Sequence, residues 1–551
     1  GRGAGSHGPP ARPPRPRQAM SAAPIRLLRG FATVGGWTMA SRILGFLRDV
    51  LIAGLLGAGP AAEAFFVGFR LPNMFRRFFA EGAFNMAFVP LFAKRLEGEG
   101  RDSARAFAEE ALAVLLAALL AFSAAALLFM PALVFLLAAG FADDAEKFDL
   151  AVAYARIQFP YLTCMALTAM FSGALNALGR FAAPAAAPVL LNAVLIGAMG
   201  LAAGLAWPVG DALAWGVFAA GFGQVALVVV AARGAGMAVG LRRPRLTPGV
   251  RRLIRLGVPG AVSGGVMQVN LLIGTIVASF FDGAVAWLSY ADRLYQLPLG
   301  VVGVAVGVVL LPELARRVRA DDAAGARDAM NRAAEFALAL TLPAGAALIA
   351  IPGPIVATLF ERGAFTAADS AATAAAAALF ALGLPAFVLQ KVVQPAFFAR
   401  EDMVTPLRCA AWAMAANSAI SVAGGWTIGW LAIPLGSALG GWLMLALLWR
   451  GARRFGEGAR VDARLARRAP RMLAAAILSA GAAWAAAWGL APLFPDPWLR
   501  WPAIGATVAA GGAAYALLAW AFGAVVPADL RGALRRGDAD GKGVSAPDEA
   551  G

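Results

Sequence analysis

Residues 111–139 read ALAVLLAALLAFSAAALLFMPALVFLLAA, a run of 29 positions with no charged side chain. An α-helix needs about 20 apolar residues to cross a hydrocarbon core about 30 Å thick, so this run is long enough to span a membrane. The rest of the chain shares its character: 60% of the 551 residues are hydrophobic, 15% are charged, and the mean hydropathy is +0.71. Strands of a membrane β-barrel would show short alternating segments instead. The sequence therefore predicts an all-α polytopic membrane protein.

Apolar segments between polar breaks predict fourteen transmembrane helices, with ends good to a few residues. We expect them near 28–57, 61–95, 104–139, 147–178, 184–206, 211–233, 250–281, 284–317, 327–360, 367–399, 405–426, 430–450, 470–493 and 500–526. They group into a six-helix N-lobe at 28–235, a six-helix C-lobe at 236–455, and two C-terminal helices within 456–526.

A weak internal repeat underlies the two lobes. Residues 89–95 (VPLFAKR) match 311–317 (LPELARR), about 222 positions later, and 131–141 resembles 354–365. Six predicted helices separate the copies. Because six is an even number, both copies keep the same orientation, as in transporters built from parallel repeats. Chance similarity between Ala- and Leu-rich helices is the alternative, and the shared Pro and Arg positions favour a true repeat.

The charged residues of the breaks are distributed unevenly. Arginines crowd the breaks on one side, as in 242–255 and 453–468, whereas the opposite breaks hold mostly acids such as Asp143 and Asp211. Because cytoplasmic loops carry an excess of Lys and Arg, this pattern places both termini in the cytoplasm. Residues 1–27, rich in Pro, Arg and Gly, are then expected to be a disordered basic tail, and 527–551 a cytoplasmic tail.

Composition excludes several classes of function. The net charge of +16 does not predict nucleic-acid binding, because the chain has no basic domain interleaved with aromatic residues. His7 is the only histidine, and Cys164 and Cys409 are isolated in or beside apolar segments, so we expect no metal site and no disulfide framework. No P-loop or nucleophile elbow is present either. We predict no cofactor, no metal and no enzymatic activity.

Five arginines lie inside the apolar segments: Arg42, Arg48, Arg76, Arg77 and Arg293. A charged residue at mid-membrane depth costs roughly 2.5–3.5 kcal/mol on insertion scales, so it normally faces a partner or a watery cavity. Guanidinium groups from both lobes around one hydrated space would bind a phosphate or a carboxylate. The alternative is that each arginine pairs with a neighbouring helix. Because the arginines are many and outnumber their acids, we favour an anion site.

Helical geometry adds supporting residues to this site. Arg42 and Arg48 diverge by about 120° on an ideal helix, but a bend at Gly45 would let them converge. Ser41 shares the face of Arg48. Asn73, Arg77 and Glu81 form one row at a spacing of four, and Asp49, Glu81 and Asp292 can partner the arginines when no ligand is bound. Two further residues have open alternatives: Lys391 faces the cavity or the cytoplasmic interface, and Glu63 has a functional role or caps a helix.

Four motifs carry a specific resemblance: 41–49 (SRILGFLRD), 71–84 (LPNMFRRFFAEGAF), 290–293 (YADR) and 397–406 (FFAREDMVTP). Together they closely resemble the MurJ (MviN) family of bacterial lipid II flippases, over nearly the whole chain from about residue 28. The resemblance implies a fold of the MATE-like MOP exporter superfamily in the bacterial inner membrane. It also implies flipping of undecaprenyl-diphosphate-linked disaccharide-pentapeptide, which is lipid II, for peptidoglycan synthesis. Lipid II, membrane lipids and the cell-wall synthesis machinery are the implied partners.

The resemblance also suggests roles for individual residues. Arg42, Arg48, Arg76 and Arg293 match the cavity arginines that the family needs, with Ser41, Glu81 and Asp292 as supporting positions. Glu63 departs from the family pattern, which usually has Asp there. The last two helices match the part of the family's fold that shapes a groove for the lipid tail.

Other functions remain open at this point, because a cationic cavity serves more than one of them. A polysaccharide-unit flippase of the same superfamily would also need one. A drug or cation antiporter would present more acids than arginines, and a membrane glycosyltransferase would need catalytic carboxylates and usually a metal-binding acidic pair. The favoured hypothesis is lipid II flipping by alternating access of the two lobes.

Overall fold

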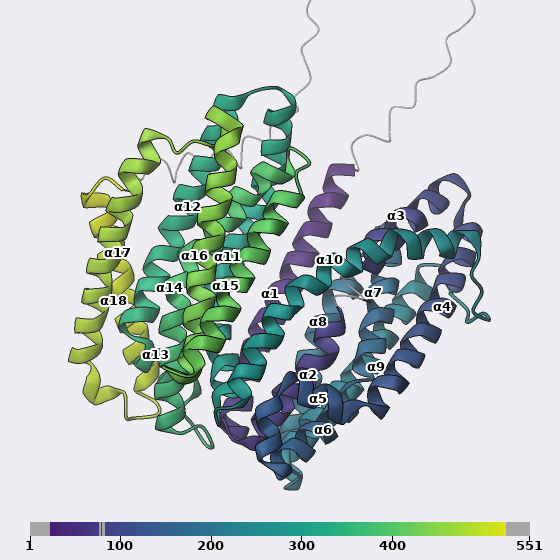
Figure 1. Ribbon diagram of the computed structural model, residues 1–551, viewed down its shortest axis with the longest axis horizontal. Helices are drawn as coiled ribbons and strands as arrows, with labels where there is room; N and C mark the ends of the chain where they lie inside the picture. The colour runs from purple at the N-terminus through teal and green to yellow at the C-terminus, as the bar shows by residue number, and fades with distance from the viewer. Residues whose placement is uncertain (1–22, 77–78, 80–82, 525–551) are drawn as a thin grey trace, which may run out of the picture.

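The computed structural model describes residues 23–76, 79 and 83–524 (Figure 1). Every regular element in this part of the chain is helical, which confirms the predicted fold class. The α-helices are α1 (Ala23–Leu56), α2 (Pro60–Arg76), α3 (Ala83–Gly98), α4 (Arg101–Leu128), α5 (Met130–Leu137), α6 (Ala145–Gln158), α7 (Tyr161–Ala177), α8 (Ala182–Leu205), α9 (Val209–Gly234), α10 (Pro248–Ser279), α11 (Ala284–Arg319), α12 (Ala323–Ala350), α13 (Pro352–Phe360), α14 (Ala367–Phe398), α15 (Val404–Gly425), α16 (Ala432–Ala452), α17 (Ala463–Gly489) and α18 (Arg500–Ala521). Short 3-10 helices are η2 (Ala139–Asp143), η3 (Gly429–Leu431), η4 (Arg453–Ala459) and η5 (Ala491–Leu493).

Each predicted segment corresponds to one α-helix or to a consecutive pair. Prolines explain three of the four pairs: Pro131, Pro160 and Pro352 stand at the start of α5, α7 and α13. A proline lacks the N–H of a continuous helix and clashes with the turn before it, so the helix breaks there. Nine helical segments of the described chain are long and apolar enough to cross a membrane. The count of fourteen crossings stays a prediction.

The helix boundaries repeat along the chain. Helices α4 and α12 each have 28 residues and begin 222 positions apart, at Arg101 and Ala323. Each is followed by a short second helix, α5 or α13, and the next helices, α6 and α14, also begin 222 positions apart. The sequence repeat therefore extends to the structure at α4–α5 and α12–α13, where a 28-residue helix is followed by a short one, although α6 has 14 residues and α14 has 32.

Two helix bundles form the molecule (Figure 1). Helices α1–α9 make the amino-terminal bundle and α11–α18 the carboxy-terminal bundle, while α10 packs against α3 of the first and α15 of the second. In Figure 1 the bundles converge at the lower end, beside the α1–α2 turn, and diverge toward the end where α1 begins. We call these the turn end and the amino end.

Backbones approach closely at the turn end. The N–H of Ala364, before α14, donates to the carbonyl of Gly54 in α1 at 2.8 Å. Gly57 has φ +63°, and a Cβ there would lie 2.4 Å from the carbonyl oxygen of Ala364. A second close approach joins η2 to the end of α10, where a Cβ on Gly140 would lie 2.5 Å from the backbone of Ser279. Glycine is needed at both contacts, because no L side chain fits such distances.

Side-chain caps fix several helix starts in the loops. Thr366 and Asp369 form a capping box at α14, and Asp144 caps α6. Before α18, the Asp496 carboxylate accepts the N–H groups of Trp498 and Leu499, and these bonds lower the pKa of that carboxyl. Such caps satisfy N–H groups that have no partner within the helix.

Candidate functional site

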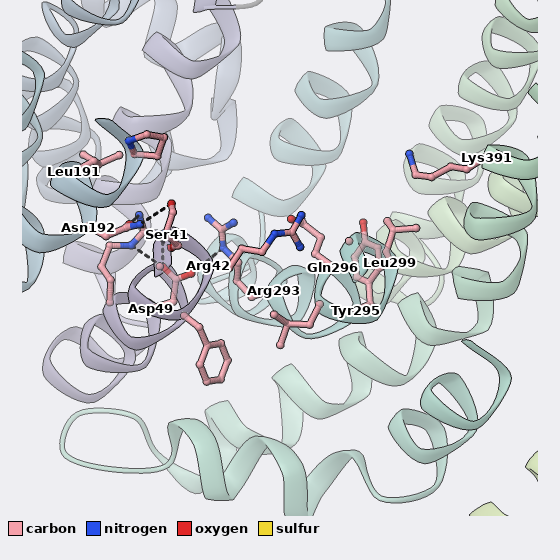
Figure 2. A pocket seen from close by; sticks show the side chains of 16 residues that line it. Ser41, Arg42, Asp49, Leu191, Asn192, Arg293, Tyr295, Gln296, Leu299 and Lys391 are labelled. Atoms are coloured by element: carbon pink, nitrogen blue, oxygen red, sulfur yellow. Dashed lines mark hydrogen bonds and ion pairs between the residues drawn. The ribbon is translucent and has the colours of Figure 1, made fainter. Parts of the chain in front are cut away.

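One cavity of about 800 Å³ lies between the two bundles, beside the middle of α1. Its walls come from α1, α8, α11 and α14, so both bundles contribute to it (Figure 2). The lining residues are Ser41, Arg42, Gly45, Phe46, Arg48, Asp49, Pro188, Leu191, Asn192, Arg293, Tyr295, Gln296, Leu297, Leu299, Gly300 and Lys391.

Positive charge is in excess in this cavity. Its lining holds four cations, Arg42, Arg48, Arg293 and Lys391, against the single carboxylate of Asp49. Helices α1 and α11 supply the three arginines and are absent from the nine helical segments that qualify as spans by length and composition. Charges inside helices of a membrane protein are costly, so their concentration on two facing helices indicates a hydrated functional site.

Asp49 pairs with two arginines, Arg48 of its own helix and Arg293 of the other bundle. Its Oδ1 accepts bonds from Nε and Nη2 of Arg48 at 2.9 and 2.6 Å, and its Oδ2 pairs with Nε of Arg293 at 2.9 Å. Arg48 and Asp49 are buried in α1, whereas the Arg293 side chain from α11 is 44% exposed. One carboxylate therefore neutralises only part of the charge of two guanidinium groups.

Arg42 reaches the second bundle at a glycine. A Cβ built on Gly300 of α11 would lie 2.0 Å from Nη1 of Arg42, so the guanidinium rests directly on the backbone of α11. Gly300 is the first glycine of α11, and the two bundles approach each other closely there. Figure 2 shows Arg42 and Arg293 close together in the middle of the cavity.

Lys391 approaches the cavity from α14. Figure 2 shows its ammonium group across open space from the arginines of α1 and α11. Of its two predicted positions, the cavity is the one it takes in this conformation. Because the ammonium is exposed, it adds positive charge to the space without a fixed partner on the wall.

An amide that the sequence analysis missed completes the wall beside Arg48. Asn192 of α8 accepts a bond from Nη1 of Arg48 at 2.8 Å and donates to the backbone oxygen of Ser41 at 3.0 Å. Ser41 is thus tied to Arg48 through Asn192, on the face that the two residues were predicted to share. No local pattern marks Asn192, because the residue it contacts lies 144 positions earlier.

The remaining predicted residues on α2 and α11 lie outside the cavity lining. Arg76 is the half-buried last residue of α2, so its predicted substrate role has no support from this cavity and stays a prediction. Asn73 donates to Phe69 within the same helix. Asp292 accepts a bond from the amide of Gln296, which does line the cavity. Arg77 and Glu81 fall outside the described residues.

Glu63 belongs to a second charged cluster, at the turn end. Its carboxylate pairs with Lys147 of α6 at 2.5 Å and accepts the N–H of Val285, at the start of α11, at 3.1 Å. Lys147 also pairs with Asp282, just before α11, at 3.1 Å. Glu63 lies in the first turn of its own helix, as one predicted alternative stated, and its carboxylate also caps α11 of the other bundle.

Arg70 is a second residue that the sequence analysis passed over. Its guanidinium extends from α2 to α10 and α11, where it contacts the hydroxyl groups of Thr275 and Ser289. Its neighbours in sequence, Phe69 and Leu71, are apolar, and it lies in the same predicted apolar segment as Arg76 and Arg77. That signal, an arginine inside an apolar segment, could have identified it.

Known proteins resemble this chain over nearly its whole length. The family model "Lipid II flippase MurJ" matches residues 52–495. The chain is also 47% identical over 529 residues to the "Probable lipid II flippase MurJ" of Rhizobium meliloti (strain 1021), and the match covers 93% of this chain and 97% of the relative. This chain belongs to the MurJ family of lipid II flippases.

Two solved structures of other proteins have a fold similar to that of this chain. "Lipid II flippase MurJ, inward closed conformation" matches with a TM-score of 0.71 at 22% identity, over 89% of this chain and 98% of that one. "Inward-facing conformation of a multidrug resistance MATE family transporter of the MOP superfamily" matches with a TM-score of 0.64 at 16% identity, over 78% and 99%. The predicted MATE-like fold is confirmed.

Membership of the MurJ family also settles the class of protein. The family consists of membrane flippases, so this chain is a transporter and not an enzyme. The glycosyltransferase and the drug antiporter that the sequence left open belong to other families. The cationic cavity between the bundles is the candidate substrate site of this transporter.

Proposed function

We propose that this chain moves lipid II from the inner to the outer leaflet of the bacterial cytoplasmic membrane. The diphosphate of the substrate binds Arg42, Arg48 and Arg293 in the cavity, while the polyprenyl tail stays in the lipid beside the protein. Only the polar head then needs a hydrated path. The cell-wall enzymes that supply and consume this lipid are the proposed protein partners.

The observation that carries this proposal is one cavity with four cations and one carboxylate, shared by both bundles. A diphosphate offers more acceptor oxygens and more negative charge than Asp49, so it can replace that carboxylate on Arg48 and Arg293. Each hydrogen bond to a charged group is worth about 1.5–3 kcal/mol. The ion pairs of Asp49 hold Arg48 and Arg293 in place until the substrate arrives, and they leave the site with net positive charge.

Alternating access follows from the shape of the interface. The bundles are joined at the turn end and diverge at the amino end, where the arginine-rich loops lie. We assign the amino end to the cytoplasm by the positive-inside rule, so this conformation receives substrate from the inner leaflet. Rocking of the lobes at 28–235 and 236–455 would then expose the cavity to the periplasm. Residues 456–526 would accompany the C-lobe, beside the lipid tail.

The membrane potential would favour this direction of transport. A negative head moving outward through an inside-negative potential gains about 2.3 kcal/mol per charge that crosses fully at 100 mV. The emptied cavity carries net positive charge and would be drawn inward by the same potential. Collapse of the potential should therefore slow flipping.

Complementation tests the assignment of the site. Cells depleted of their own MurJ would receive the wild-type chain, Arg42→Ala, Arg48→Ala or Arg293→Ala, with equal membrane levels verified by immunoblotting. Arg316→Ala is the matched control, because that arginine pairs with Glu313 on the exposed end of α11. We expect growth with the control and lysis, with accumulated lipid II, for the cavity variants. Normal growth with all three cavity variants would refute the assignment.

A further inference from the structure

The strongest unexplained feature of the cavity wall is Asn192. It lies on α8, behind α1, and only 5% of its surface is exposed. Its Oδ1 accepts a bond from Nη1 of Arg48 at 2.8 Å, and its Nδ2 donates to the backbone oxygen of Ser41 at 3.0 Å and to the Ser41 hydroxyl at 3.5 Å. These contacts set the orientation of the amide. In the flipped orientation its NH2 group would face the Arg48 cation and its oxygen would face the Ser41 carbonyl.

Arg48 is therefore held from two sides by groups of different charge. Asn192 holds Nη1 with a neutral oxygen, whereas Asp49 holds Nε and Nη2 with a carboxylate. A diphosphate that enters the cavity competes with Asp49, since both are anions that need the same guanidinium edge. It does not compete with Asn192, which occupies another N–H group.

We propose that Asn192 is a positioning residue for the diphosphate site, which keeps Arg48 aimed into the cavity while Asp49 is exchanged for the substrate. This inference rests on the proposed function. An arginine side chain has many rotamers, and a fixed neutral anchor removes the entropic cost of ordering it when the ligand binds. The anchor also leaves the positive charge of Arg48 available, which a carboxylate in its place would not.

The packing around Asn192 suits this residue type. A Cβ on Gly45 of α1 would lie 3.4 Å from Nδ2 of Asn192, so the two helices are in close contact there and a longer amide would be crowded. Leucine has a similar volume but would leave Arg48 and the Ser41 carbonyl without this partner. Aspartate would keep an acceptor for Arg48 and add a second negative charge to the cavity.

Binding measurements on the purified full-length protein in nanodiscs test the proposal, with undecaprenyl diphosphate as the probe. Asn192→Leu should weaken binding roughly tenfold, the size expected for one hydrogen bond to a charged group. Arg48→Ala should weaken it at least as much. The double variant Asn192→Leu/Arg48→Ala should bind no more weakly than Arg48→Ala alone, because Asn192 acts through Arg48.

Gln224→Leu is the matched control. Gln224 is a buried amide in α9 of the same bundle, bonded to Tyr161 and to the backbone of Ala187, and it does not line the cavity. We expect Gln224→Leu to lower thermal stability without changing the dissociation constant. Equal loss of binding in Gln224→Leu and Asn192→Leu would mean a merely structural role and would overturn the proposal.

A second variant keeps the test decisive if Asn192→Leu folds poorly. Asn192→Asp preserves the acceptor for Arg48, and its binding defect relative to wild type should shrink as the pH falls and the new carboxyl is protonated. A defect independent of pH, or additive losses in the double variant, would overturn the proposal. If Arg48→Ala itself bound the probe normally, the proposed diphosphate site would fail first, and the role of Asn192 with it.

Discussion

Two charged clusters connect the bundles, and they differ in balance. At the turn end, Lys147 is surrounded by the acids Glu63 and Asp282, and the Glu63 and Lys147 side chains are 1% and 3% exposed. In the cavity, four cations share the single acid Asp49, and the Arg293 side chain is 44% exposed. The buried pair of the first cluster, Glu63 and Lys147, satisfies its charges within the protein, with Asp282 exposed at its edge, whereas the second cluster leaves positive charge unsatisfied beside a void.

The difference separates a joint from a binding site. Buried ions with complete partners hold two surfaces in one register, and they exclude water and ligands. Exposed cations with too few acids attract an anion, and their ion pairs can be exchanged for it. The same helix, α11, serves both purposes: its first turn meets Glu63, and Arg293, two turns later, meets Asp49.

The largest effect is expected when the charged cluster at the turn end loses its cation, Lys147. Lys147→Met leaves the buried Glu63 carboxylate without an ionic partner, which should cost about 3–5 kcal/mol of stability. Thermal unfolding of the purified protein would measure it. The double variant Lys147→Met/Glu63→Gln removes the uncompensated charge and should recover most of the loss. A single variant as stable as wild type would contradict the view of this cluster as a structural joint.

A smaller effect should distinguish rigid from flexible contacts between the bundles. Gly140→Ala places a Cβ 2.5 Å from the backbone of Ser279, which cannot rotate away, and such overpacking typically costs about 1–3 kcal/mol. Distance measurements between spin labels at the turn end should show the bundles further apart. Gly300→Ala is the matched comparison, because its Cβ meets only the flexible tip of Arg42. Equal shifts at the turn end in both variants would refute the distinction.

The smallest effect is expected from the most exposed cation of the cavity. Lys391→Gln removes one charge that has no fixed partner on the wall, and exposed charges contribute up to about 1 kcal/mol, which is roughly a fivefold change in affinity. The difference from wild type in binding of undecaprenyl diphosphate should decrease as salt is added, because salt screens exposed charges. A difference independent of salt would indicate a direct, buried contact instead.

Much of the architecture was predictable from local sequence patterns. Apolar segments located every α-helix, alone or in pairs, and the prolines at 131, 160 and 352 explain three pairings that hydropathy could not resolve. The repeat of about 222 positions reappears in the helix boundaries. The site was predictable in part: charged residues inside apolar segments pointed to Arg42, Arg48 and Arg293, which line one cavity.

Partners of these residues were not predictable, because they come from helices distant in the sequence. Asn192 meets Arg48 across 144 positions, and Val285 meets Glu63 across 222. The sequence around a polar residue in an apolar helix does not tell which other helix that residue will contact. Glu63 illustrates the consequence: an acid at a helix start suited a cap, yet only the structure shows that Glu63 is buried and caps α11 of the other bundle.

The sequence by itself determined that this chain is a membrane protein with a repeated set of helices and with arginines inside apolar segments, because hydropathy is a local property that can be read along the chain. Only the tertiary structure decided which cations share a cavity, which acid partners them and which charges close the turn end. Those choices depend on packing between helices from separate bundles, where distances of a few ångströms set the electrostatic energy.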